Sequence, residues 1–120
     1  APGMKYRHYA PKGQLTLVEG DAGRVIEKIN QLAQEKEKEG FRVGIIGTDE
    51  TIGEYHTGIR RSIGSRQHPD SVAANLYSIL RECDALGLDY IYSESFFEKG
   101  LGNAIMNRML KAAGYHLITV

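Results

Sequence analysis

The sequence predicts a three-layer α/β domain in which helices cover both faces of a mostly parallel five-stranded sheet. Two observations lead to this prediction: short apolar runs alternate with segments of helical periodicity, and each strand–helix unit spans roughly 30 residues. A third observation is size, because 120 residues with 42% hydrophobic and 25% charged residues are ordinary for one globular domain. We expect an extended arm over residues 1–12 and a folded body over residues 13–120.

Five segments of the body have strand patterns. They are short apolar runs between turn-forming or charged residues, at residues 14–19, 42–47, 59–63, 88–93 and 115–120. The run 42–47 is continuously apolar after its first residue, which is typical of a buried parallel strand. The run 59–63 carries Arg60 and Arg61, so we expect it at an edge of the sheet. Right-handed crossovers then favour a small Rossmann-like sheet with the strand order 3-2-1-4-5, although the link between its second and third strands has only about ten residues.

Three segments have the apolar stripe of an amphipathic helix. Their expected caps or first residues are Asp21, Pro69 and Asn103. Glycines are expected to end them, at Gly40, Gly87 and Gly114. The second stripe includes Cys83, which we therefore interpret as a core cysteine and not as a nucleophile.

The composition excludes several classes of protein. Fifteen basic and fifteen acidic residues give a net charge of zero, whereas a protein that holds duplex nucleic acid is normally basic. The chain has no run of 18 apolar residues and no apolar leader, so we expect a cytoplasmic protein without membrane or direct DNA binding. Its single cysteine excludes an intrachain disulfide. The four histidines lack metal-ligand spacing, so we expect no metal site and structural or surface roles for His56, His68 and His116.

Four loops follow the expected strands and would meet at one edge of the sheet, where open α/β sheets bind ligands. They are residues 20–23, 48–50, 64–66 and 93–95. None has the GxGxxG or GxxxxGK[ST] pattern of a nucleotide site, so we favour glycines that serve tight turns, with a ligand site as the alternative. Arg66 is a candidate anion contact together with Arg60 and Arg61, although a solvated edge is favoured. Glu94 is a carboxylate without a visible acid–base partner.

The arm has a different composition from the body. Its basic residues Lys5, Arg7 and Lys12 are not balanced by any acid, and Tyr6, His8 and Tyr9 lie among them. Cations can cover a phosphate, and tyrosines can stack on a base or on a guanidinium group. Two interpretations remain open on these grounds: an RNA-binding tail, or an interdomain linker that folds over a neighbouring nucleotide site.

Residues 1–11 read Ala-Pro-Gly-Met-Lys-Tyr-Arg-His-Tyr-Ala-Pro, which resembles the interdomain linker of the two-domain threonylcarbamoyl-adenylate synthases. The family pattern usually opens Ser-Pro-Gly-Met, so Ala1 departs from it. Further segments resemble the C-terminal domain of that family, at residues 18–21, 64–66, 74–77 and 100–108. The resemblance covers essentially the whole chain. It implies a Rossmann-like C-terminal domain that follows a YrdC-like catalytic domain.

The resemblance also implies a function. The family makes threonylcarbamoyl-AMP from threonine, bicarbonate and ATP, and a threonylcarbamoyl transferase complex then modifies an adenosine of tRNA. The substrate sites lie in the YrdC-like domain, so this chain is expected to hold no catalytic residue, to bind no cofactor and to be inactive alone. ATP and Mg²⁺ are expected in the parent enzyme. The linker lies over the active site in the family, which makes Lys5, Tyr6, His8 and Tyr9 the candidate lid residues.

Two alternatives to this function stay open: a stand-alone nucleotide-binding regulatory domain and a small RNA-interaction module that uses the arm. One further expectation concerns order. Without a catalytic domain to cover, residues 1–10 lack contacts that would offset their ordering entropy, so we expect them to be mobile.

Overall fold

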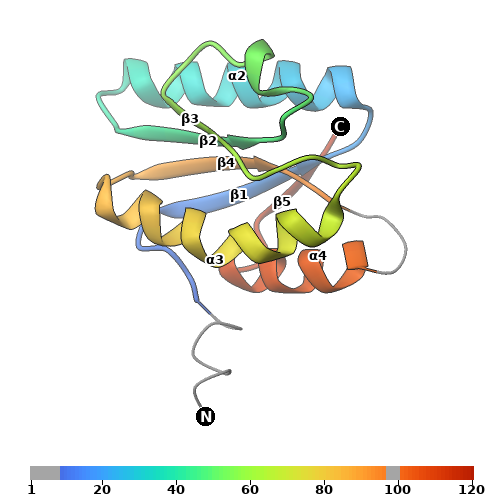
Figure 1. Ribbon diagram of the computed structural model, residues 1–120. Helices are drawn as coiled ribbons and strands as arrows, with labels where there is room; N and C mark the ends of the chain where they lie inside the picture. Colours follow the sequence, from blue (N-terminus) through green and yellow to red (C-terminus); the bar gives the residue numbers. More distant parts are fainter. Residues whose placement is uncertain (1–8, 97–100) are drawn as a thin grey trace.

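The computed structural model describes residues 9–96 and 101–120 of the chain. Its elements are β1 (Gln14–Glu19), α2 (Ala22–Lys38), β2 (Val43–Gly47), the 3₁₀ turn η1 (Ile52–Glu54), β3 (Ile59–Ser62), α3 (Pro69–Ala85), β4 (Tyr90–Glu94), α4 (Leu101–Ala112) and β5 (Leu117–Thr119). The five strands form one sheet, and all its strand pairs are parallel. Helix α2 covers one face of the sheet, and α3 and α4 cover the other (Figure 1). The three-layer α/β prediction is confirmed.

The predicted helix boundaries follow from their capping residues. The Asp21 carboxylate accepts hydrogen bonds from the backbone N–H groups of Gly23 at 3.2 Å and Arg24 at 3.4 Å, which satisfies two amides at the start of α2. Gly40 follows the end of α2 with a φ of +93°, a conformation that side chains disfavour. Helix α3 begins at Pro69, as predicted, because the fixed φ of proline suits the first helical turn.

The predicted strand order 3-2-1-4-5 is wrong, because the sheet has the order β3-β2-β4-β1-β5. Strand β4 lies between β1 and β2, and Ile91 is paired with Leu15 on one side and with Gly44 on the other. The connection through α2 therefore passes over one strand position. Sequence patterns and the right-handed rule give the direction of a crossover, but they do not say how many positions it skips. The short link between β2 and β3 does join parallel neighbours, with η1 inside it.

The C-terminal part differs from the prediction in two places. Asn103 is not a cap, because α4 begins at Leu101 and Asn103 lies inside it. Strand β5 covers only three residues, because the chain first completes the C-terminal turn of α4: the Tyr115 N–H donates to the Leu110 carbonyl at 2.8 Å, and Tyr115 has a φ of +62°. The predicted strand at 115–120 was therefore too long.

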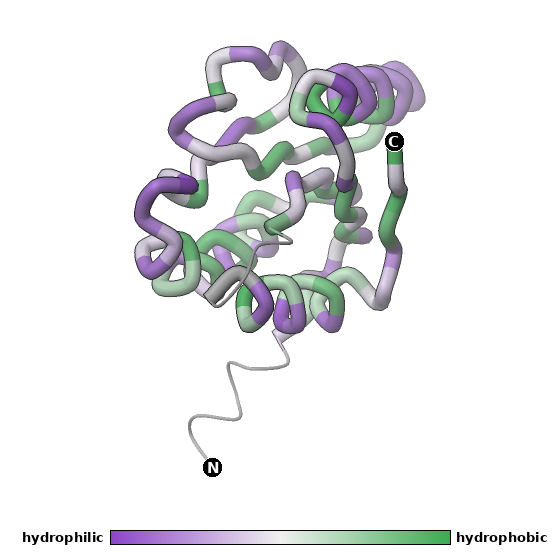
Figure 2. The backbone as a smooth tube through the Cα atoms, turned by 90° about the vertical axis from the view of Figure 1, so that its right-hand side faces the viewer, coloured by the Kyte–Doolittle hydropathy of each residue, from purple (hydrophilic) through white to green (hydrophobic). Residues whose placement is uncertain are grey.

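The sheet separates two apolar layers. The layer under α3 and α4 includes Leu15, Leu17, Ile46, Leu76, Ile91 and Met109. The layer under α2 includes Val18, Val25, Ile29, Ile45 and Tyr92. Figure 2 shows the hydrophobic strands between helices whose turns alternate between hydrophobic and hydrophilic colours. Cys83 is buried in the first layer, and this burial raises the pKa of its thiol to about 11, so the prediction of a core cysteine is confirmed.

Candidate functional site

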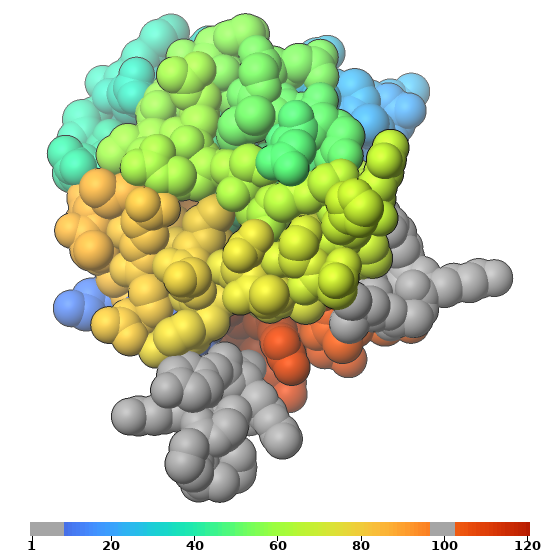
Figure 3. Space-filling view, in the orientation of Figure 1, coloured from blue at the N-terminus to red at the C-terminus, as the bar shows by residue number. Residues whose placement is uncertain are grey.

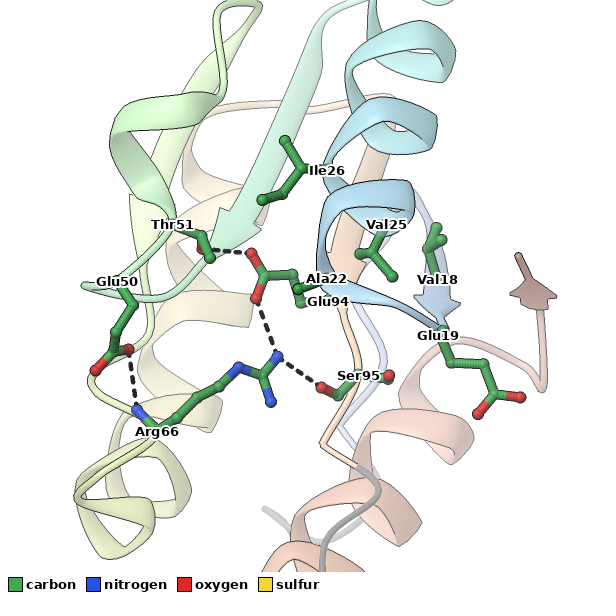
Figure 4. Close-up of a pocket in the computed structure, with 11 residues that line it drawn as sticks. Val18, Glu19, Ala22, Val25, Ile26, Glu50, Thr51, Arg66, Glu94 and Ser95 are labelled. Carbon is green, nitrogen blue, oxygen red and sulfur yellow. Dashed lines mark hydrogen bonds and ion pairs between the residues drawn. The ribbon is translucent and has the colours of Figure 1, made fainter.

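A pocket of about 480 Å³ opens at the carboxyl ends of β1, β2 and β4. Its walls come from the four loops that the sequence predicts to meet and from the first turn of α2 (Figure 4). The lining residues are Val18, Glu19, Gly20, Ala22, Val25, Ile26, Glu50, Thr51, Arg66, Glu94 and Ser95. The predicted convergence of these loops is therefore confirmed.

The pocket lies at the switch point of the sheet. Neighbouring strands β1 and β4 continue into helices on opposite faces, β1 into α2 and β4 into α4 (Figure 1). The two helices lie on opposite faces of the sheet, and the pocket opens beside the ends of these two strands. Ligands of open α/β sheets bind in a crevice of this kind.

Glu94 lies in this pocket, and its side chain is only 4% exposed. Its carboxylate accepts hydrogen bonds from the Tyr55 hydroxyl at 2.6 Å and the Thr51 hydroxyl at 2.5 Å, and it forms an ion pair of 3.0 Å with Arg66. Burial and the adjacent Glu94 both raise the pKa of Tyr55 well above its usual value, so this phenol stays a neutral donor. The sequence left Glu94 without a partner, but the fold supplies three.

Arg66 is held from several sides. One guanidinium nitrogen donates to Glu94 at 3.0 Å and to the Ser95 carbonyl at 2.8 Å, and the guanidinium lies 4.4 Å from the centre of the Phe96 ring. The backbone N–H of Arg66 donates to Glu50 at 3.1 Å. The structure thus places the candidate anion contact against a carboxylate.

The other two arginines of the predicted cluster point elsewhere. Arg60 donates to the Tyr55 carbonyl at 2.8 Å, and Arg61 pairs with Glu82 of α3 at 3.0 Å. Both are exposed on β3, the edge strand that lies beside α3 on the face shown in Figure 3. The three arginines therefore do not form one anion site, and the solvated-edge interpretation is confirmed for Arg60 and Arg61.

The root of the arm is attached to the body. The Tyr9 hydroxyl donates to the Asp84 carboxylate, which also accepts from the Lys12 backbone N–H at 2.7 Å. The Tyr9 ring contacts the Tyr77 ring edge-to-face at a centroid distance of 5.3 Å. The hydrogen bond to Asp84 is the largest cause that raises the pKa of Tyr9 to about 12. For Tyr9, the expectation that residues 1–10 lack contacts is wrong, because α3 offers an acceptor and an aromatic ring.

The remaining candidate lid residues, Lys5, Tyr6 and His8, lie outside the described residues. His56, His68 and His116 are all exposed, which confirms the surface interpretation for these histidines. Over residues 9–96 and 101–120, no three histidine, cysteine or acidic side chains gather in a way that could hold a metal ion. Across the same ranges, no helix is long and apolar enough to cross a membrane.

Fold and site together define a small all-parallel α/β domain with a switch-point pocket and an N-terminal arm tied to α3. Residues 1–114 match the model of the family described as "Threonylcarbamoyl-AMP synthase, C-terminal domain", and the chain belongs to this family. The recognition made from the linker and body motifs is thereby confirmed.

Similar proteins carry the same name. The chain is 45% identical over 118 residues to the threonylcarbamoyl-AMP synthase of Bacillus subtilis, with 98% of this chain and 33% of that protein covered. It is 43% identical over 120 residues to that of Pyrococcus abyssi, with 100% of this chain and 34% of that protein covered. The chain therefore spans about a third of the length of these relatives.

Two solved structures have the same fold. The crystal structure of P. abyssi Sua5 complexed with L-threonine matches with a TM-score of 0.84 and 43% identity, covering 100% of this chain and 34% of that one. The C-terminal Sua5 domain from Pyrococcus horikoshii matches with a TM-score of 0.73 and 34% identity, covering 92% of this chain and 100% of that one. The second structure is a crystal structure of the C-terminal domain as a separate chain.

Proposed function

We propose that this chain is the accessory C-terminal domain, with the active-site-covering linker, of an enzyme that makes threonylcarbamoyl-AMP from threonine, bicarbonate and ATP. The observation that carries the proposal is the family match over residues 1–114, which includes the arm as well as the body. The chemistry belongs to a YrdC-like catalytic domain of the same chain, where ATP and Mg²⁺ bind. The product serves the threonylcarbamoyl transferase complex that modifies tRNA in the cytoplasm.

The described contacts of Tyr9 suggest how the arm works. Tyr9 is held on α3 by Asp84 and Tyr77, which gives the arm a fixed root on the body. An extended chain covers at most about 3.6 Å per residue, so the Cα atom of Lys5 can lie no farther than about 14 Å from the Cα atom of Tyr9. The body therefore determines which part of the catalytic domain the arm can cover.

The composition of the arm suits a lid over a nucleotide and an amino acid. The Lys5 ammonium would meet phosphate charge, and Tyr6 and His8 would close the site against water. Closure that holds substrates and excludes water raises turnover as well as affinity. In this arrangement the C-terminal domain contributes position and closure, and the catalytic domain contributes the reacting groups.

The test uses the full-length enzyme and measures pyrophosphate release. Tyr6→Ala and His8→Ala should each lower turnover at least ~10-fold, which corresponds to about 1.4 kcal/mol of transition-state stabilisation. Glu35→Ala is the matched control, because Glu35 is exposed on α2, which covers the opposite face of the sheet from α3, where Tyr9 is attached (Figure 1). The arm would be a tether and not a lid if both arm variants kept full turnover.

A second measurement tests whether the catalytic domain alone supplies the reacting groups. The 120-residue chain mixed with ATP, threonine and bicarbonate should release no pyrophosphate above background. Turnover by this chain alone would contradict the assignment of all chemistry to the catalytic domain.

A further inference from the structure

We propose that the switch-point pocket binds a small molecule that carries an ammonium group on a short aliphatic body. This site is distinct from the place where the arm is attached. Tyr9 of the arm is bonded to α3, whereas one wall of the pocket is α2, on the opposite face of the sheet (Figure 1). A volume of about 480 Å³ lies in the usual range for small-molecule sites.

The charge of the lining selects a cation. Glu50 and Glu94 contribute two carboxylates, whereas the Glu19 carboxylate accepts from the Thr119 hydroxyl at 2.7 Å and points away from both of them (Figure 4). Arg66 is the one basic residue among the lining side chains in the described part of the chain. The Arg66 charge is already compensated by Glu94 at 3.0 Å. A concave site lined by an excess of one sign concentrates that field and attracts ligands of the opposite charge.

The first turn of α2 does not reverse this preference. A helix N-terminus normally favours an anion, but Asp21 places its own carboxylate on the amides of Gly23 and Arg24. Arg66 donates to Glu94 and Ser95 instead of pointing as an unpaired cation into the pocket. A phosphate or carboxylate ligand would therefore meet net negative charge at this site.

Two carboxylates offer acceptors for an ammonium group. Each carboxylate has about four lone-pair positions. Glu94 accepts from Tyr55, Thr51 and Arg66, and Glu50 accepts from the Ser65 hydroxyl and the Arg66 N–H, so the named bonds leave acceptor positions on both. These bonds also fix the two carboxylates before a ligand arrives, which lowers the entropic cost of binding. The pKa of Glu50 is lowered by the same two donors, which keeps the group charged.

The opposite wall accepts an aliphatic body. Val18, Ala22, Val25 and Ile26 line this side, and Figure 4 shows them across the pocket from Glu50 and Arg66. An alkyl chain on this wall would be removed from water while its charged end reaches the carboxylates. The apolar wall together with the fixed carboxylates of Glu50 and Glu94 makes the site specific for an alkyl group that carries a positive charge.

The first experiment compares probes of similar size and different charge. The ¹⁵N-labelled 120-residue chain is titrated with n-butylammonium, n-butyrate and 1-butanol, and amide shifts of Val25, Ile26 and Ser95 are followed by NMR. We expect saturable binding of butylammonium in the millimolar range, a typical strength for a ligand of this size. Butyrate and butanol should bind at least ~10-fold more weakly, a difference of about 1.4 kcal/mol.

Variants then locate the site. Ala22→Leu fills the pocket from an exposed helical position and should abolish the shifts, whereas Ala74→Leu makes the same change at an exposed position of α3 and should leave them intact. Glu50→Gln removes one charge from an exposed carboxylate and should weaken butylammonium binding several-fold without unfolding the domain. The proposal is overturned if no probe shifts these amides, if butyrate binds as tightly as butylammonium, or if Ala22→Leu leaves binding unchanged.

Discussion

Replacement of Glu94 by glutamine measures how much the charge of this buried carboxylate contributes to the free energy of unfolding. The two side chains have nearly the same shape, so the variant changes the charge without creating a cavity. The glutamine oxygen can still accept from Tyr55 and Thr51, which lie at 2.6 Å and 2.5 Å from the same carboxylate oxygen. Its amide group, however, faces the Arg66 guanidinium, where the native oxygen accepts at 3.0 Å.

The expected loss of stability follows from this geometry. Removal of one partner of a buried ion pair typically costs about 3–5 kcal/mol. Arg66 is 32% exposed and keeps its hydrogen bond to the Ser95 carbonyl, so water and Ser95 offset part of that cost. We expect Glu94→Gln to lower the free energy of unfolding by about 2–3 kcal/mol. Glu94→Ala should cost at least ~1 kcal/mol more, because it leaves the buried Tyr55 hydroxyl without an acceptor.

The assay is urea unfolding of the 120-residue chain at pH 7, followed by far-UV circular dichroism. For a domain of this size, the Glu94→Gln loss should also appear as a decrease of roughly 8–12 °C in melting temperature. Tyr55→Phe completes a double-mutant cycle with Glu94→Ala, and the two losses should be clearly less than additive. The reasoning is refuted if Glu94→Gln stays within about 0.5 kcal/mol of the native protein, the range of an ordinary surface change.

Three other predictions follow from single contacts. Cys83 has a thiol pKa of about 11, so at pH 8 it should react with a thiol reagent about 100-fold more slowly in the native domain than in urea. Equal rates would show that the surroundings of Cys83 open freely to solvent. Gly58→Ala should lower the free energy of unfolding by about 2 kcal/mol or more, because φ is +70° and a Cβ would lie 2.5 Å from the Val43 carbonyl oxygen. Gly53 has open space around it, so Gly53→Ala should change the unfolding midpoint little. The pKa of the Tyr9 phenol is raised from 10.0 to about 12, so the phenol should stabilise the fold fully below pH 10 and lose this contribution between pH 10 and pH 12. Tyr9→Phe should abolish this part of the pH dependence of stability. An unchanged pH dependence in the variant would contradict the Asp84 hydrogen bond.

Local rules predicted what local interactions decide. The cap at Asp21, the glycine at Gly40 and the apolar stripe with Cys83 each depend on residues within a few positions, and all were predicted correctly from the sequence. The C-terminal helix was placed less well, because Asn103 has the chemistry of a cap but is the third residue of α4. A capping residue type alone does not identify the residue at which a helix begins.

Long-range pairing was the part that the sequence could not decide. The strand order depends on which gap β4 occupies, and the edge position of β3 was predictable only because Arg60 and Arg61 mark it as exposed. The pocket loops were predicted because parallel strands place their carboxyl ends at one edge. The partners of Glu94 were not, because Thr51 and Arg66 lie 43 and 28 residues away and nothing near them in the sequence points to a shared carboxylate.

The position of β4 between β1 and β2 has a consequence for synthesis of the chain on the ribosome. Strands β1 and β2 emerge first, but each pairs with β4, and the register joins Gln14 and Val43 to Tyr90. In a nascent chain that ends before β4, strands β1 and β2 therefore lack the strand that pairs with both of them. Their unpaired backbone N–H and C=O groups can form hydrogen bonds with wrong partners. The β1–β4 and β2–β4 pairs can form only after Glu94 has left the exit tunnel, so we expect the sheet to be completed late in synthesis.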